Sequence, residues 1–212
     1  MPFFWSPIGI RPSASLHEVD RAAVSAANPI EAFRRASAGA DERITAIKPD
    51  QWRSPTPCAE WDVRALVNHL VYEDLSAPCV LEGSTPAEIG DRFDGDLLGG
   101  DPVGAWKSAR EGVLEAASGT PMDRTVHLFF GDVLAAAYLN QLAQGHVIHT
   151  WDIARAIGAD EHLDPELVAW TYGAMKPQEE MLGRSGVFDA AVTPSPDADM
   201  QAKLLNLTGR RP

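Results

Sequence analysis

The chain has 212 residues, with 18 basic and 30 acidic side chains, and therefore a formal charge of −12 at neutral pH. This length suits one domain with a sizeable core, and a composition of 45% hydrophobic and 23% charged residues excludes a wholly disordered chain. A charge of −12 repels a phosphate backbone, and the densest basic spots are only the pairs Arg34-Arg35 and Arg210-Arg211. No stretch approaches the roughly 18–20 apolar residues of a membrane span, and the two cysteines, Cys58 and Cys79, make no disulfide framework. We expect a soluble, cytoplasmic protein that binds neither nucleic acid nor membrane.

The first 28 residues lack the pattern of a helix or a strand. Pro2, Pro7 and Pro12 interrupt them, because proline breaks regular elements. The apolar start carries no basic residue ahead of it and is unlike a secretory signal peptide. We expect an N-terminal arm over residues 1–28, followed by one helical domain with a C-terminal extension over residues 29–212.

Apolar residues recur every three or four positions along much of the remaining chain, which predicts helices. Five are expected, over residues 29–48, 62–78, 102–118, 133–157 and 164–180. Asn28 and Asp62 suit N-cap positions, and Gly158 suits the stop of the fourth helix. Residues 125–131 are the one strand candidate, as a hairpin or as an extended crossover, and residues 81–101 form a long connection. This order indicates an all-α helical bundle with one long crossover, an additional helix and an irregular C-terminal tail.

Histidines on two of the predicted helices are the candidate site residues. On a helical wheel His149 lies in the middle of the apolar stripe of the fourth helix, with His146 at the edge of that stripe. His69 flanks the ridge of Leu66 and Leu70 on the second helix. Two inward-facing histidines from different helices are a common basis for a metal site in a bundle, although each could instead be a core histidine bonded to a carbonyl or a carboxylate.

Three blocks of sequence resemble one known family. Residues 55–71 read PTPCAEWDVRALVNHLV, residues 147–158 read VIHTWDIARAIG, and residues 204–210 read LLNLTGR. In this order they resemble the DinB-like bundles related to the N-terminal domain of mycothiol-dependent maleylpyruvate isomerase. The resemblance implies an antiparallel four-helix bundle and a metal site with three protein ligands, two of which carry over to His69 and His149. Two bonds of about 2.0–2.1 Å to one ion would hold the two imidazole nitrogens about 3–4 Å apart.

The third ligand is where the chain departs from the family pattern. The family places an acidic residue or a histidine four positions before the second histidine, and Gly145 stands there. We expect His146, which lies three positions before His149 and about 60° from it around the helix, to replace the missing ligand, and three imidazoles would suit Zn²⁺ or Ni²⁺. The loss of a charged ligand predicts weaker metal binding than in relatives. The alternative is that the metal site has decayed.

Other candidates have less support from the sequence. Cys58 precedes a helix and could have a lowered pKa and react, or could be a buried small residue. Asp152 and Arg155 are expected to pair or to make cap contacts, and His127 is an outside candidate for a ligand.

Two classes of function remain open. The first is a metal- and thiol-dependent isomerase or S-transferase, in which a low-molecular-weight thiol such as mycothiol attacks a small electrophile. About 50 residues follow the fourth helix, too few for the additional C-terminal domain of the isomerase, so maleylpyruvate isomerisation itself is not expected. The second is a non-catalytic bundle that binds a small molecule or acts in a stress response. The oligomeric state is open, with a homodimer as the candidate.

Overall fold

The computed structural model of the protein describes residues 28–185 and 189–212. The predicted N-terminal arm therefore lies outside the described residues, apart from Asn28. The described part is mainly helical, with one small two-stranded sheet, so the predicted helical class is confirmed. None of the helices in this part combines the length and the apolar character that a membrane span requires.

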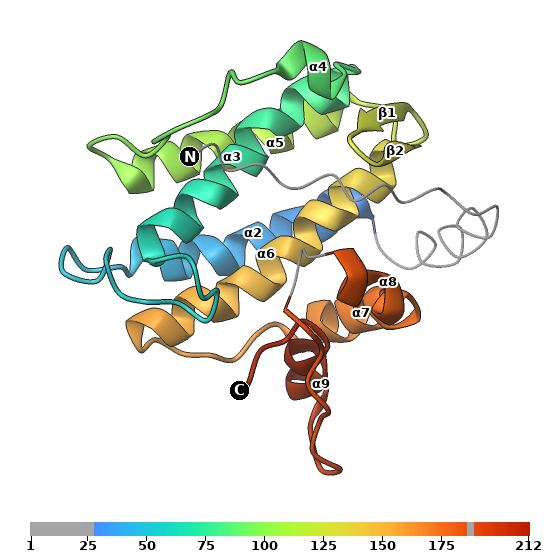
Figure 1. The fold of residues 1–212 in the computed structure, drawn as a ribbon. Coiled ribbons are helices and arrows are strands. Elements are labelled where there is room, and N and C mark those ends of the chain that lie inside the picture. The colour runs from blue at the N-terminus through green and yellow to red at the C-terminus, as the bar shows by residue number, and fades with distance from the viewer. Residues whose placement is uncertain (1–27, 186–188) are drawn as a thin grey trace.

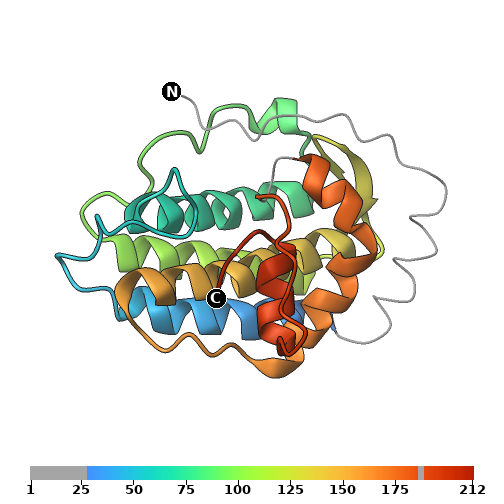
Figure 2. The same cartoon turned by 60° about the horizontal axis from the view of Figure 1, so that its bottom comes forward.

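Four long helices pack alongside one another (Figures 1 and 2). They are α2 (Pro29–Thr45), α3 (Val63–Glu82), α5 (Pro102–Gly119) and α6 (Ala135–Ile157). The apolar stripe predicted on α3 is buried, because its members at spacings of three and four share one face: Val63, Leu66, Val67, Leu70 and Val71. In contrast, α6 is buried around most of its circumference, since every residue from His146 to Ala154 is buried. Polar side chains on several faces of α6 therefore lie inside the protein.

The helix ends show the expected capping. The side chain of Asn28 accepts a hydrogen bond from the backbone N–H of Ile30, and that of Asp62 accepts one from Ala65. Gly158 ends α6 in the left-handed region, with φ of 67°, where glycine carries no steric penalty. α3 continues four residues beyond its predicted end at Pro78. The proline removes one helical hydrogen bond, but the buried face of the helix continues through Val80 and Leu81.

The strand candidate forms a hairpin, which settles the two alternatives. β1 (Thr125–Leu128) pairs antiparallel with β2 (Gly131–Leu134) around the two-residue turn Phe129-Phe130. The last two residues of β2 pair with the first two of β1. α6 consequently begins at Ala135 rather than at the predicted residue 133.

The remaining elements surround the long helices. The crossover contains the short α4 (Pro86–Ile89), which the sequence analysis did not predict and which Thr85 and Glu88 cap reciprocally. The predicted fifth helix divides into α7 (Pro165–Met175), a 3₁₀ turn (Lys176–Gln178) and α8 (Glu179–Ser185), because Pro177 interrupts the helical hydrogen bonds. The chain ends after α9 (Met200–Leu207), and the segment that follows it lies against α6 (Figure 2).

Candidate metal and thiol site

Two histidine rings meet between α3 and α6. The rings of His69 and His149 lie edge to face, with centroids 5.5 Å apart. The two rings therefore approach each other, and the spacing of about 3–4 Å between their nitrogens stays a prediction. His149 is buried, whereas the side chain of His69 is 25% exposed, so the pair opens to the protein surface on the α3 side.

The loop before α3 supplies one wall of this site. The ring of Trp61 lies 4.6 Å from that of His69 and 6.3 Å from that of His149, between centroids. The hydroxyl of Thr56 holds the loop closed, since it accepts a hydrogen bond from the N–H of Cys58 and donates one to the carbonyl of Trp61. Thr56, Cys58 and Trp61 thus have a local structural reason to occur together just ahead of His69.

A carboxylate fixes the orientation of His149. Nδ1 of His149 lies 2.9 Å from Oδ2 of Asp152, one turn further along α6. Burial opposes ionisation of Asp152, but hydrogen bonds from His149 and Arg210 outweigh it and lower the pKa of Asp152 to about 2. An ionised carboxylate only accepts hydrogen bonds, so Nδ1 of His149 is the donor, and Nε2 is the ring nitrogen left for another partner. This is the arrangement that orients metal-binding histidines in other proteins.

The C-terminal segment completes this network. Arg210 donates from Nε to Oδ1 of Asp152 over 3.1 Å and from Nη2 to Oδ2 over 2.8 Å. Both side chains are buried. The three blocks of sequence described above therefore meet at one place, since the first carries His69, the second His149 and Asp152, and the third Arg210.

Cys58 lies next to the same network. Its Sγ is 3.4 Å from Oδ2 of Asp152 and 3.3 Å from Nη2 of Arg210. Cys58, His149 and Asp152 bring ligand atoms within 4.8 Å of one another, a spacing that a metal ion could use. However, the Arg210 guanidinium contacts Asp152 and Cys58, and Nδ1 of His149 is bonded to Asp152. A second cation would be repelled there, so the face of His149 toward His69 is the candidate side for a metal ion.

The environment of Cys58 argues against a reactive thiolate. Burial raises the pKa of its thiol, the negative charge of Asp152 raises it further, and the value reaches about 12. The alternative of a buried, unreactive cysteine is thus the one that the geometry supports. The structural cause is burial together with the Asp152 carboxylate, whose effects on the pKa of Cys58 outweigh the opposite effect of the nearby Arg210 guanidinium.

We expect Cys58 to be alkylated very slowly in the folded protein. With a pKa of about 12, only roughly one molecule in 10⁴ is a thiolate at pH 8. The measurement is the rate of reaction with iodoacetamide in a Cys79→Ser variant, so that Cys58 is the one remaining cysteine. Unfolding in urea should restore the rate of an ordinary cysteine. A fast reaction of the folded protein at pH 8 would contradict this assignment.

His69 has a second neighbour on its own helix. Nε2 of His69 lies 3.6 Å from Oε2 of Glu73, one turn along α3. Burial lowers the pKa of His69, which keeps the imidazole neutral at physiological pH, as a metal ligand must be. Glu73 is not among the residues predicted from the sequence, although its position four residues after His69 was the available signal.

His146 lies deeper in the protein than His69 and His149. Its ring packs against Phe33 and Trp106, with centroids 5.1 and 5.4 Å away. Its Nε2 is 3.2 Å from Oδ1 of Asp74, and both side chains are completely buried. The two atoms are close but not aligned as a hydrogen bond. The role of His146 as a third ligand stays a prediction, and the closest acidic partner that the structure gives it is Asp74.

The weaker candidates have other partners. Asp152 and Arg155 do not pair with each other, so the expected pairing is wrong: Asp152 bonds to His149 and Arg210, whereas Arg155 bonds to Glu161. The outside candidate His127 lies on the hairpin, with Nδ1 2.8 Å from Oδ1 of Asp132. That contact is explained by their pairing across the two strands.

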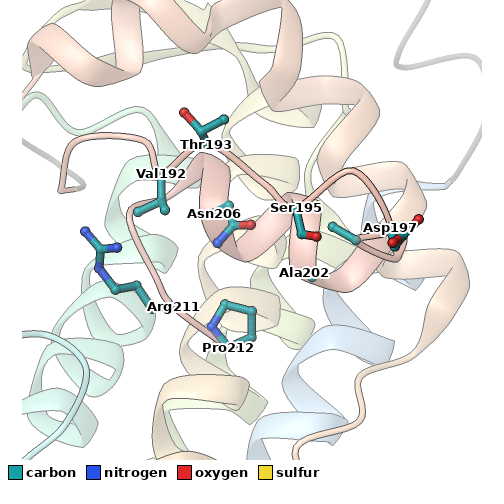
Figure 3. A pocket seen from close by; sticks show the side chains of 9 residues that line it. Val192, Thr193, Ser195, Asp197, Ala202, Asn206, Arg211 and Pro212 are labelled. Atoms are coloured by element: carbon teal, nitrogen blue, oxygen red, sulfur yellow. The ribbon is translucent and has the colours of Figure 1, made fainter.

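A separate shallow hollow of about 350 Å³ lies beside α9 (Figure 3). Figure 3 shows the side chains of Asn206, Arg211 and Pro212 around it, with Thr193 and Ser195 from the preceding segment. It shares no lining residue with the histidine site and contains no histidine or cysteine. The histidine pair therefore remains the candidate site.

The comparisons with known proteins decide the family. The family model of the mycothiol maleylpyruvate isomerase N-terminal domain matches residues 33–154, which include α3 and α5 and most of α2 and α6. The chain belongs to this family. Two uncharacterized proteins of Mycobacterium tuberculosis, from strains CDC 1551 / Oshkosh and ATCC 25618 / H37Rv, are each 29% identical to this family member over 140 residues, covering 66% of the chain and 73% of the relative. No solved structure matches it.

Proposed function

We propose that the protein binds a divalent metal ion through His69 and His149 and acts on a small electrophile together with a low-molecular-weight thiol. The observation that carries this proposal is the His69–His149 pair, in which two helices bring two imidazoles together and Asp152 orients one of them. Imidazole ligands suit Zn²⁺ or Ni²⁺. The four long helices would then form the antiparallel four-helix bundle of the DinB-like proteins.

The reaction class follows from the family and from the chemistry of the site. The family name points to mycothiol as the thiol, and the reaction would be an isomerisation or an S-transfer in the cytoplasm. A bound divalent ion would lower the pKa of a coordinated thiol, so that the thiolate forms near neutral pH. Cys58 is not the nucleophile, because its pKa is about 12. An external thiol and its electrophile would enter from the partly exposed side, beside Trp61 and His69.

A second function is favoured by one observation. Gly145 carries no side chain at the position where the family pattern has a ligand. A bundle with an incomplete site would hold a small molecule without catalysis. Metal affinity distinguishes the two functions, since the catalytic proposal requires the ion.

The experiment is a calorimetric titration of the metal-stripped full chain with Zn²⁺ and Ni²⁺. We expect one site per chain in the wild type and a loss of affinity of at least about 100-fold in His69→Ala and in His149→Ala, because each removes a direct ligand. His127→Ala is the matched control, since His127 lies on the hairpin and should bind metal like the wild type. Absence of binding by the wild type would overturn the proposal in favour of the non-catalytic function.

A further inference from the structure

Gly145 leaves space in α6 that a side chain from the opposite helix enters. A Cβ added at Gly145 would lie 3.8 Å from Oε2 of Glu73, and no other atom outside its own helical surroundings lies within 4 Å. Glu73 belongs to α3. Its carboxylate therefore crosses between the two helices and ends beside the position where a ligand side chain on α6 would begin.

The same carboxylate oxygen faces His69. Oε2 of Glu73 is 3.6 Å from Nε2 of His69, which is longer than an N–H···O hydrogen bond of about 2.7–3.2 Å. Two ligand bonds of about 2.0–2.2 Å at a tetrahedral angle hold their donor atoms about 3.3–3.6 Å apart. The two side chains also lie on one face of α3, because they are separated by one helical turn. Their spacing is thus that of two ligands of one ion.

The charge of Glu73 has no fixed partner in the part of the chain that the structure describes. No lysine or arginine of residues 28–185 or 189–212 is recorded within ion-pair distance of it, and His69 is its one basic neighbour. The side chain is only 15% exposed. A carboxylate in this position gains from a cation, since little water remains around it and the imidazole of His69 stands beside it.

We propose that Glu73 is the third protein ligand of the metal site, brought to the ion by rotation of its flexible side chain, because among the described residues only Cys58, His149 and Asp152 already have three donor atoms within 4.8 Å of one another. This inference rests on the proposed function, because it concerns the same ion as His69 and His149. It reverses the family arrangement: α3 supplies two ligands one turn apart and α6 supplies one. Glu73 would also supply the negative charge that an acidic ligand at position 145 provides in the family pattern. His146 is not needed for this set, since it packs against Phe33 and Trp106 next to Asp74.

The test is a carboxylate exchange between the two helices, measured by zinc titration of the full chain. Glu73→Gln keeps the shape of the side chain and removes its charge, and we expect zinc affinity to fall by at least about 100-fold. In the double variant Glu73→Gln/Gly145→Glu the carboxylate comes from α6, and we expect most of the lost affinity to return. Glu82→Gln, at the exposed end of α3, is the matched control and should bind zinc like the wild type.

The outcomes separate this inference from the proposed function. If the wild type binds zinc, His69→Ala does not, and Glu73→Gln binds like the wild type, then Glu73 is not a ligand although the metal site exists. If Glu73→Gln and the control Glu82→Gln lose affinity equally, the effect is one of overall charge and the inference fails. If the wild type binds no zinc, the proposed function fails first. Far-UV circular dichroism of each variant establishes that the affinities are those of folded protein.

Discussion

Replacement of Arg210 by methionine is expected to lower the free energy of unfolding by about 3–5 kcal/mol, because it leaves the carboxylate of Asp152 buried without its cationic partner. Arg210 donates two hydrogen bonds to Asp152, and the side chain of Asp152 is fully buried. Methionine keeps much of the length and apolar contact of the arginine stem, so the loss reports mainly on the charge. Urea denaturation, followed by circular dichroism, measures it.

A double variant tests this explanation. In Arg210→Met/Asp152→Asn neither charge remains, so we expect it to be more stable than Arg210→Met alone. The control is Arg34→Met, which removes an exposed arginine paired with Glu31 on α2 and should leave stability unchanged, as exposed ion pairs contribute little. If Arg210→Met is as stable as Arg34→Met, the C-terminal segment does not hold Asp152 as described.

The Arg210–Asp152 pair also makes the free energy of unfolding depend on pH in the acid range. The pKa of Asp152 is lowered to about 2 in the folded protein, against about 3.9 in an unfolded chain. Its contribution to stability is therefore complete above about pH 4 and is lost as the pH falls toward 2. Without Arg210 the pKa of Asp152 should rise, and acid unfolding of Arg210→Met should begin at a higher pH than that of the wild type.

Local sequence patterns predicted the helices because helices form through interactions between residues that are close in the sequence. The apolar stripe of α3 and the caps at Asn28, Asp62 and Gly158 follow from spacings of three or four residues and from side chains that bond to the nearest backbone. The errors were also local. Pro78 lies inside α3, whereas Pro177 interrupts a helix, and the sequence around each proline does not say which neighbouring contacts will compensate.

The neighbours of the site residues could not be predicted in this way, because the site is formed by contacts between segments that are far apart in the sequence. Arg210 and Asp152 are 58 positions apart, and Cys58 and Asp152 are 94 apart, so no helical wheel could join them. A wheel likewise indicated that His146 and His149 share one stripe, but α6 is buried on most sides. The neighbours of α6 therefore decide what each histidine meets: α3 brings His69 to His149 and Asp74 to His146.

His146 is expected to stabilise the core rather than to bind the ion. His146→Ala should lower the free energy of unfolding by about 2–4 kcal/mol, because it leaves a cavity beside Phe33 and Trp106 and removes the closest partner of Asp74. Burial raises the pKa of Asp74, so the neutral acid is favoured there and its neighbour matters for stability. Chemical denaturation of the metal-free protein measures the loss.

A volume-conserving variant separates packing from ligation. His146→Phe fills the same space without a ligand nitrogen, and Asp74→Leu/His146→Phe removes both buried polar groups, so we expect the double variant to be at least as stable as His146→Phe alone. If His146 is structural, folded His146→Phe should bind zinc like the wild type, in contrast to His149→Ala. If it keeps wild-type stability and loses zinc as fully as His149→Ala, then His146 is the third ligand that the sequence predicted, and Glu73 is not.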